Sequence, residues 1–182
     1  MKPETGSSAP GEIRIRHVRA SDRDAVAEIL NDAQVNLGTQ RLPYHCDSVV
    51  AAWIEDDPAW TKLVAEIDGR VAGFGALETF PHRPRLRHGG EIDMVATHPE
   101  FRGRGVGPAM LRAMVDLADR WLQLTRLQLY VWDGNETAIR LYESMGFRTE
   151  GRLRRYVFVD GAYRDALIMA RLIDDLPPPH AE

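Results

Sequence analysis

Residues 101–110 read FRGRGVGPAM and stand between a predicted strand and a predicted helix. The three glycines in this stretch allow the backbone to approach a ligand without Cβ clashes. The helix that follows presents free N–H groups and a partial positive charge at its N-terminus. Pro108 suits the first helical turn, where its missing N–H costs little. The stretch therefore predicts a loop that binds an anion, best suited to phosphate or pyrophosphate.

Two other phosphate-binding motifs are excluded by their spacing. A Walker loop needs Gly-Lys-Ser/Thr, and no lysine follows the glycines here. A dinucleotide fingerprint needs Gly-x-Gly-x-x-Gly, but the sixth position is Pro108 counted from Gly103 and Met110 counted from Gly105. Taken alone, the stretch also fits a solvated glycine-rich turn, and that alternative stays open at this point.

A second motif, NETAIRLYESMGF, occupies residues 135–147. Asn135 is a natural helix N-cap, and Tyr142 lies seven residues later, two turns along the same helical face. The phenol can donate a hydrogen bond and has an ordinary pKa of about 10. Taken alone, Tyr142 also fits a core residue whose hydroxyl reaches the edge of the core.

The order of predicted elements along the chain is β, α, α, β, β, β, α, β, α, β, β. Apolar alternation predicts the strands, and Asp68-Gly69 and Asp160-Gly161 predict the turns of two hairpins. One helix is expected from Ser21 to Leu37, and the helix after the glycine loop is expected to turn Trp121 toward the core. We expect one α/β domain over residues 12–174, with a mixed, mostly antiparallel twisted sheet of about six to seven strands flanked by about four helices. Residues 1–11 and 175–182 are expected to be flexible tails.

The composition bounds the function classes. The chain has 182 residues and a net charge of −4, so we expect one globular domain with no general attraction to nucleic acid or anionic membranes. The single cysteine, Cys46, excludes an internal disulfide and a cysteine-based zinc site, and no metal is expected. The chain shows neither a signal peptide nor a run of 18 apolar residues, so a reducing, cytoplasmic location is expected.

Together, the two motifs resemble the GNAT superfamily of acyl-CoA-dependent N-acetyltransferases. The signature Arg/Gln-x-x-Gly-x-Gly/Ala is matched by Arg102, Gly105 and Gly107. The signature Asn-x-x-Ala-x-x-Leu-Tyr-x-x-x-Gly-Phe is matched at Asn135, Ala138, Leu141, Tyr142, Gly146 and Phe147. The element order agrees with the family over about residues 12–172, nearly the whole chain.

The resemblance implies acetyl-CoA as the co-substrate and a role for each part of the two motifs. Backbone N–H groups of residues 103–108 would hold the pyrophosphate, and the strand end at 95–97 would pair with the pantetheine arm. The N–H of Val95 would polarise the acetyl carbonyl, Asn135 would contact the pantetheine, and Tyr142 would protonate or hydrogen-bond the departing thiolate. The implied cofactor-binding residues are Val95, Ala96, Thr97, Arg102, Gly103, Arg104, Gly105, Val106, Gly107, Pro108, Asn135, Ala138 and Tyr142.

An ammonium group cannot attack a thioester, so its proton must be removed. Relatives that acetylate protein N-termini often carry a Glu at the position that Tyr130 occupies in this chain. Glu91 and Asp93 are the predicted replacements, since alternation places both on one face of the strand before the acetyl-binding segment. A structural role for these carboxylates, Tyr130 as the base, and a water chain all stay open.

The acceptor is expected between the loop at 36–47 and the last hairpin, at Asn36, Thr39, Arg41, Tyr44, Tyr130 and Tyr156. Arginine with aromatic residues suits a small amine that carries a carboxylate and an apolar group. Several segments are also similar to a bacterial (YhhY-like) subgroup linked to acetylation of free amino acids. The predicted activity is acetyl transfer to the primary amine of a free amino acid or similar small molecule. A protein N-terminal or lysine acetyltransferase of the ribosomal-protein type and a non-catalytic acetyl-CoA-binding regulatory module are the alternatives. Similar proteins are often dimers, so a homodimer is expected.

Overall fold

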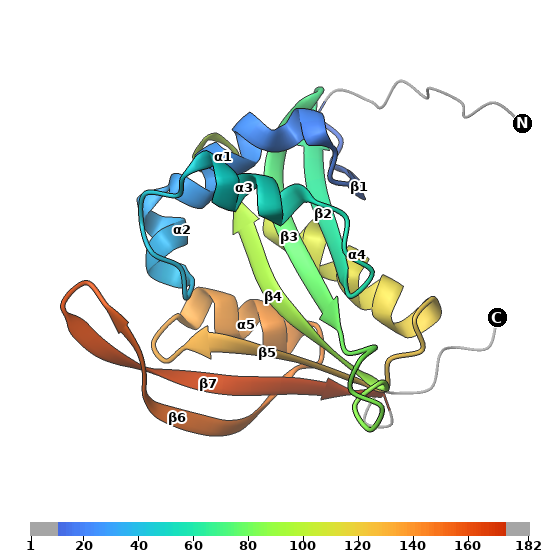
Figure 1. The fold of residues 1–182 in the computed structure, drawn as a ribbon. Coiled ribbons are helices and arrows are strands. Elements are labelled where there is room, and N and C mark those ends of the chain that lie inside the picture. Colours follow the sequence, from blue (N-terminus) through green and yellow to red (C-terminus); the bar gives the residue numbers. More distant parts are fainter. Residues whose placement is uncertain (1–10, 174–182) are drawn as a thin grey trace, which may run out of the picture.

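A computed structural model describes residues 11–173 of the chain (Figure 1). The tails expected at 1–11 and 175–182 lie outside the described residues, except that the N–H of Gly11 donates to the Asp68 carboxylate at 2.9 Å. Seven strands form one sheet in the order β1-β2-β3-β4-β5-β7-β6. Their bounds are β1 Arg14–His17, β2 Trp60–Ile67, β3 Arg70–Thr79, β4 Gly89–Thr97, β5 Arg126–Trp132, β6 Arg148–Val159 and β7 Ala162–Leu172. All neighbours are antiparallel except β4 and β5, which confirms the predicted α/β fold with its mixed, mostly antiparallel sheet.

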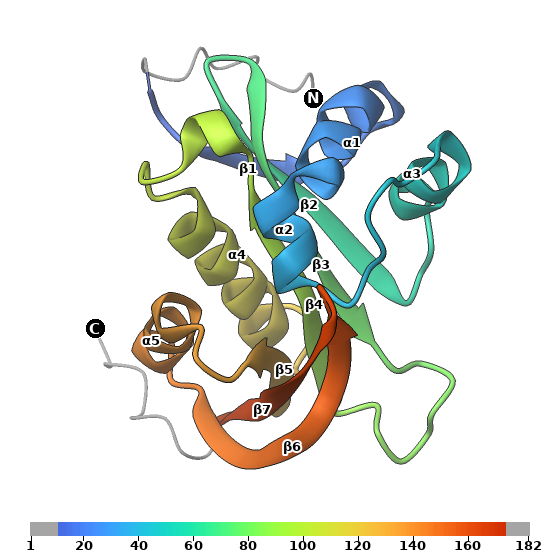
Figure 2. The same cartoon turned by 90° about the vertical axis from the view of Figure 1, so that its left-hand side faces the viewer.

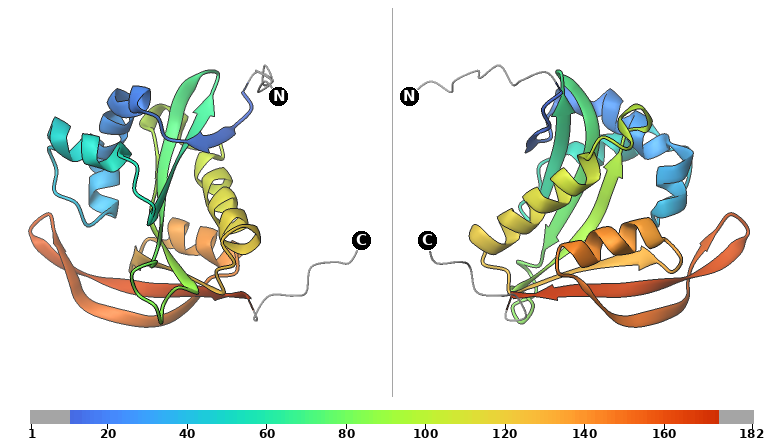
Figure 3. Two further views of the ribbon diagram at one scale, coloured as in Figure 1. Left: turned by 45° about the vertical axis from the view of Figure 1, so that its right-hand side comes forward. Right: turned by 180° about the vertical axis from the view of Figure 1, so that it is seen from behind.

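Helices cover both faces of this sheet (Figures 2 and 3). One face carries the first three helices, and the other carries the last two. Their bounds are α1 Arg23–Asn31, α2 Ala33–Gly38, α3 Asp47–Ile54, α4 Val106–Arg120 and α5 Glu136–Ser144, with short 3-10 turns at Ala20–Asp22 and Pro99–Phe101. Each face has its own core. Val26, Ile29 and Phe74 are fully buried in one core, and Met110 and Met114 are fully buried in the other.

Two local predictions about helices were wrong. The helix expected from Ser21 to Leu37 is divided at Asp32, whose extended backbone ends α1 and whose carboxylate caps α2 by accepting the N–H groups of Gln34 and Val35. This division gives five α-helices within residues 11–173, and it leaves Leu37 46% exposed. Trp121 follows the last turn of α4 and is 74% exposed, because the helix ends before it can turn that side chain inward.

The central strands β4 and β5 pair only at one end and then separate, and the space between them determines where the site lies. In the described chain they pair only at Gly89–Arg126, Gly90–Leu127 and Glu91–Gln128. Beyond these pairs β4 follows β3 and β5 follows β7, so a wedge opens between them (Figure 1). A register shift in β4 leaves Asp93 without a partner on β3 at the start of the wedge, and bulges of this kind re-aim side chains.

Candidate active site

The glycine loop enters α4 through two left-handed residues. Gly103 has a φ of +75° and Gly105 a φ of +82°, a region that costs little only for glycine. Gly105 is the N-cap of α4, and the Val106 side chain is buried beneath the first turn. Val106 therefore offers its backbone and not its side chain to a ligand.

The start of α4 is built to hold an anion. The N–H groups of Val106 and Gly107 lie in the first turn, where an α-helix supplies no acceptor. Pro108 contributes no donor there, and the helix dipole adds partial positive charge. Arg104 lies over the Phe101 ring at 5.3 Å, and Arg102 forms an ion pair with Asp32 that ties the loop to the start of α2. These features fit the pyrophosphate that the sequence predicts for this loop.

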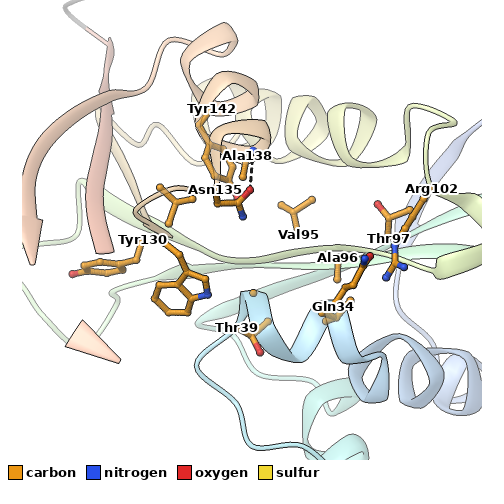
Figure 4. A pocket seen from close by; sticks show the side chains of 14 residues that line it. Gln34, Thr39, Val95, Ala96, Thr97, Arg102, Tyr130, Asn135, Ala138 and Tyr142 are labelled. Carbon is orange, nitrogen blue, oxygen red and sulfur yellow. Dashed lines mark hydrogen bonds between the residues drawn. The ribbon is translucent and has the colours of Figure 1, made fainter. Parts of the chain in front are cut away.

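The wedge between β4 and β5 contains a cavity of about 230 Å³. Figure 4 shows side chains from α2, β4, β5 and α5 around it. Within the wedge, each strand turns one backbone edge to the cavity instead of to a neighbouring strand, so an extended ligand can take the place of a strand. Its lining is Gln34, Val35, Gly38, Thr39, Val95, Ala96, Thr97, Arg102, Tyr130, Val131, Trp132, Asn135, Ala138 and Tyr142.

Asn135, at the start of α5, and Tyr142, within α5, both line the cavity in the wedge, which we call the donor cavity. The Asn135 side-chain oxygen accepts the N–H of Ala138 at 3.3 Å, which caps the helix and leaves the amide nitrogen toward the cavity (Figure 4). Burial raises the pKa of Tyr142 to about 12, and its ring packs edge-on against Phe147. The phenol is therefore protonated at neutral pH and can donate a hydrogen bond into the cavity.

A second cavity of about 400 Å³ is lined by residues from the paired ends of β4 and β5. A narrow pocket of about 30 Å³ lies between the two and shares residues with each. Tyr130 lines all three spaces, while Glu91 and Asp93 line the narrow pocket and the second cavity. The second cavity, which we call the acceptor cavity, is lined by Gln40, Glu78, Phe80, Arg83, Leu86, His88, Gly89, Glu91, Asp93, Arg126, Gln128, Tyr130 and Tyr156.

Glu91 and Asp93 line one cavity, although a bulge at Asp93 interrupts the alternation from which a shared face was predicted, and they differ in their partners. The Glu91 carboxylate accepts a hydrogen bond from the Gln128 amide at 2.9 Å. Burial raises the pKa of Glu91, and the nearby charge of Asp93 raises it further. Asp93 forms an ion pair with Arg41 at 2.8 Å, although burial still raises the pKa of Asp93. Glu91 is therefore the carboxylate that is free to accept a proton.

The structure brings some predicted acceptor residues to these cavities and not others. Thr39 and Tyr130 line the narrow pocket, and Tyr156 stacks on Tyr130 with ring centroids 5.4 Å apart. Arg41 is held by Asp93 and lies over the Trp53 ring at 3.6 Å.

Two further predicted acceptor residues lie elsewhere. Asn36 is buried and donates to the backbone oxygens of Leu30 and Asp32. Asn36 and Tyr44 line a separate pocket beside the tip of the last hairpin, where Tyr44 is 93% exposed.

Several lining residues were missed by the sequence analysis. The Trp132 indole N–H donates to the backbone oxygen of Leu37 at 2.9 Å and so fixes α2 over the wedge. Glu78 enters the acceptor cavity through its cross-strand position, and Arg83 through the loop at 80–88. The sequence offered two signals for these residues: the position of Trp132, just before the second motif, and the basic stretch RPRLRH at 83–88, which could also contact an acidic group of the substrate or the CoA 3′-phosphate.

Two broader expectations concern metals and membranes. Within residues 11–173, no group of three or more His, Cys, Asp or Glu side chains is arranged to hold a metal ion. None of the described helices has both the length and the apolar character that crossing a membrane requires.

Comparison with known proteins places this geometry in context. A family model described as the Acetyltransferase (GNAT) family matches residues 23–147. The L-amino acid N-acetyltransferase AaaT of Escherichia coli K12 is 34% identical over 161 residues, covering 88% of this chain and 98% of the relative. The spermidine N(1)-acetyltransferase of the same organism is 28% identical, covering 86% of this chain and 84% of the relative.

A solved structure agrees with these matches. The ribosomal-protein-alanine N-acetyltransferase from Brucella melitensis superposes with a TM-score of 0.80 at 28% identity, covering 88% of this chain and 99% of that one.

Proposed function

Given that this chain belongs to the GNAT acetyltransferase family and is an acetyl-CoA-dependent N-acetyltransferase, we propose that its acceptor is the primary amine of a free amino acid or similar small molecule. The observation that carries the proposal is the parting of β4 and β5 after Glu91–Gln128. Two cavities share lining residues with a narrow pocket between them, which supports a reaction in which an amine from one cavity and a thioester from the other meet there without a protein nucleophile.

The residues of the donor cavity fit acetyl-CoA. The N–H groups at the start of α4 suit its pyrophosphate, and the open edge of β4 at Val95 suits the amides of its pantetheine arm. Acetyl-CoA supplies a thioester whose carbonyl carbon is attacked by the amine. We assign to the N–H of Val95 the polarisation of that carbonyl, and to the Asn135 amide a hydrogen bond to pantetheine.

Glu91 removes the proton from the acceptor ammonium, directly or through a water molecule. Its raised pKa lies closer to neutral pH than that of an exposed carboxylate, which makes it a better general base. Asp93, held by Arg41, is a positioning residue in this scheme. Tyr130, at the position where relatives that acetylate protein N-termini often carry a Glu, lies in the same narrow pocket and orients the amine.

Tyr142 gives a proton to the leaving thiolate. As the new N–C bond forms, the C–S bond breaks and its electron pair goes to sulfur. The pKa of the buried phenol, raised to about 12, keeps the phenol protonated at neutral pH, so a hydrogen-bond donor is in place when the thiolate forms. After the attack the nitrogen still carries one proton more than the product amide; this proton passes through water to restore the phenol, and Glu91 returns its own proton to solvent, so one proton is released per turnover.

The test is a CoA-thiol release assay with acetyl-CoA against free amino acids, polyamines and short peptides. We expect turnover with small amines at least about tenfold above that with peptides in kcat/KM. Turnover with peptides alone would support the protein N-terminal or lysine acetyltransferase instead. Measurable acetyl-CoA binding without turnover on any amine would contradict the proposal.

The proposal also covers the cellular location, the absence of a nucleic-acid or membrane partner, and the oligomeric state. A cytoplasmic location is supported by a single cysteine in the chain. The acidic net charge of −4 supports the absence of a nucleic-acid or membrane partner. Analytical ultracentrifugation of the purified protein tests the homodimer, for which the described residues identify no interface.

A further inference from the structure

Two glutamates are neighbours in the wall of the acceptor cavity. Glu78 on β3 and Glu91 on β4 are direct cross-strand partners, and both line the cavity. Like charges directly opposite each other destabilise an antiparallel pair. Burial raises the pKa of Glu78, and the charge of Glu91 raises it further, so the two groups interact. The pair therefore carries a cost in the free protein.

The cations near this pair are committed to other partners. Arg41 is paired with Asp93, and both terminal nitrogens of Arg126 are bound by Glu150. Arg83 lies over the Phe80 ring at 5.2 Å on the loop at 80–88, and its charge reaches Glu78 without an ion pair. Within residues 11–173, the Glu78 carboxylate thus has no ion pair, and Glu91 has its hydrogen bond from Gln128.

We propose that the acceptor carries a second cationic group besides the amine that is acetylated, and that Glu78 binds this second group. The inference rests on the proposed function, in which Glu91 takes the reacting ammonium and leaves Glu78 uncompensated. The acceptor class is then a diamine or a diamino acid. Arg83, on the same cavity wall, offers a partner for the carboxylate of a diamino acid.

The cost of the Glu78–Glu91 pair becomes a gain when such an acceptor binds. Each carboxylate acquires a charge-assisted hydrogen bond, and their mutual repulsion is offset by two positive charges. An acceptor with one amine leaves Glu78 unpaired beside an apolar chain. The site therefore discriminates by charge rather than by the length of the aliphatic chain.

The test compares acceptors that differ by one amino group. Lysine is compared with norleucine, and 1,5-diaminopentane with pentylamine, in the CoA-release assay at pH 7.5. We expect kcat/KM to be about tenfold or more higher for the dibasic member of each pair. Glu78→Gln should reduce that preference to about twofold or less by lowering kcat/KM for the dibasic member alone.

Two variants control this experiment. Glu143→Gln removes the same charge from an exposed position of α5, and it should leave the preference unchanged. Glu78→Asp keeps the charge on a shorter side chain, and it should retain part of the preference, which a purely structural role would not predict. Acetyl-CoA binding, measured for each variant, reports whether the fold is intact.

Two outcomes would overturn the inference while leaving the proposed function intact. One is turnover by the wild-type enzyme that does not differ between the dibasic and monobasic members of the pairs. The other is a Glu78→Gln variant that loses the same factor with every acceptor, which would assign Glu78 to proton transfer or to structure. Absence of turnover with any amine is a different result, because it contradicts the proposed function itself.

Discussion

The donor cavity and the acceptor cavity, which meet at the β4–β5 wedge, present different kinds of groups to their ligands. The donor side relies on backbone, with left-handed glycines at 103 and 105, free N–H groups at the start of α4 and the open edge of β4. The acceptor side relies on side chains from separate strands and loops, among them three carboxylates and Arg83. The first surface suits one ligand of fixed chemistry, and the second can change its specificity by single substitutions.

This difference explains how each side tolerates change. A backbone site fails when the chain can no longer adopt its conformation, so its residues are fixed by geometry. A side-chain site fails in charge or shape at one position, while the fold is unaffected. Substitutions on the two sides should therefore separate acetyl-CoA binding from acceptor choice.

The largest effect is expected from Gly105→Asp. The residue has a φ of +82°, and the new carboxylate would face the bound pyrophosphate at the start of α4. We expect the Kd for acetyl-CoA, measured by isothermal titration calorimetry, to rise about 1,000-fold through lost N–H contacts and charge repulsion.

Gly69→Asp is the matched control for this variant. Gly69 has a φ of +77° in the β2–β3 turn, and a Cβ there would meet no atom within 4 Å. It carries the same backbone strain and the same new charge, so it should cost some stability and leave acetyl-CoA binding unchanged. Equal affinity for Gly105→Asp and Gly69→Asp would show that the pyrophosphate binds elsewhere.

The next effect concerns the acceptor side. Glu91→Gln should lower kcat by about 100-fold, because the proton of the ammonium loses its acceptor, while the Kd for acetyl-CoA stays the same. In the wild type, kcat/KM should rise with pH through the raised pKa of Glu91 as the carboxylate ionises, and the variant should lack this limb.

Asp93→Asn serves as the comparison for Glu91→Gln, since Asp93 is already paired with Arg41. It should keep the acid limb of the pH profile and lose less in kcat. If Asp93→Asn abolished the rise of kcat/KM with pH while Glu91→Gln kept it, Asp93 would be the general base and Glu91 the positioning residue.

A smaller effect is expected from Tyr142→Phe. The ring stays packed against Phe147 while the buried phenol proton is lost. We expect kcat to fall about tenfold with little change in acetyl-CoA binding, because the hydrogen bond forms fully only with the departing thiolate. A rate equal to that of the wild type would remove Tyr142 as the general acid.

The smallest effect is on stability. The pKa of Glu78 is raised in the folded chain, so its contribution to folding is favourable at low pH and is lost as pH rises through that raised value. Glu78→Gln should therefore melt about 1 to 2 °C above the wild type at pH 7 and level with it near pH 4, by calorimetry. A lower melting temperature at pH 7 would mean that Glu78 stabilises the free protein.

The same difference explains what could be predicted from the sequence. The donor side is encoded locally: the glycines, Asn135 and Tyr142 stand in two short motifs whose resemblance to the family's signatures assigned them to the donor site. The acceptor side depends on strand register, because Glu78 meets Glu91 only after β3 and β4 pair. Glu91 was predicted because it precedes, on its own strand, the segment that is expected to bind the acetyl group.

The two wrong predictions about helices, the continuous helix from Ser21 to Leu37 and the inward-facing Trp121, have the same cause. Asp32 was one polar residue within an amphipathic pattern, and its capping of α2 became visible only in three dimensions. Trp121 fits the apolar face of α4 by periodicity, but the helix ends before it. Local patterns cannot show where a helix stops when no glycine or proline marks the end.

The most direct measurement is a crystal structure of the protein with CoA. We predict that its pantetheine lies between β4 and β5 alongside Val95, with its pyrophosphate on the backbone N–H groups of residues 103–108. The thiol should then reach Tyr142 and open toward the narrow pocket that holds Glu91. A pantetheine arm bound outside the wedge, or a pyrophosphate away from the start of α4, would contradict the account.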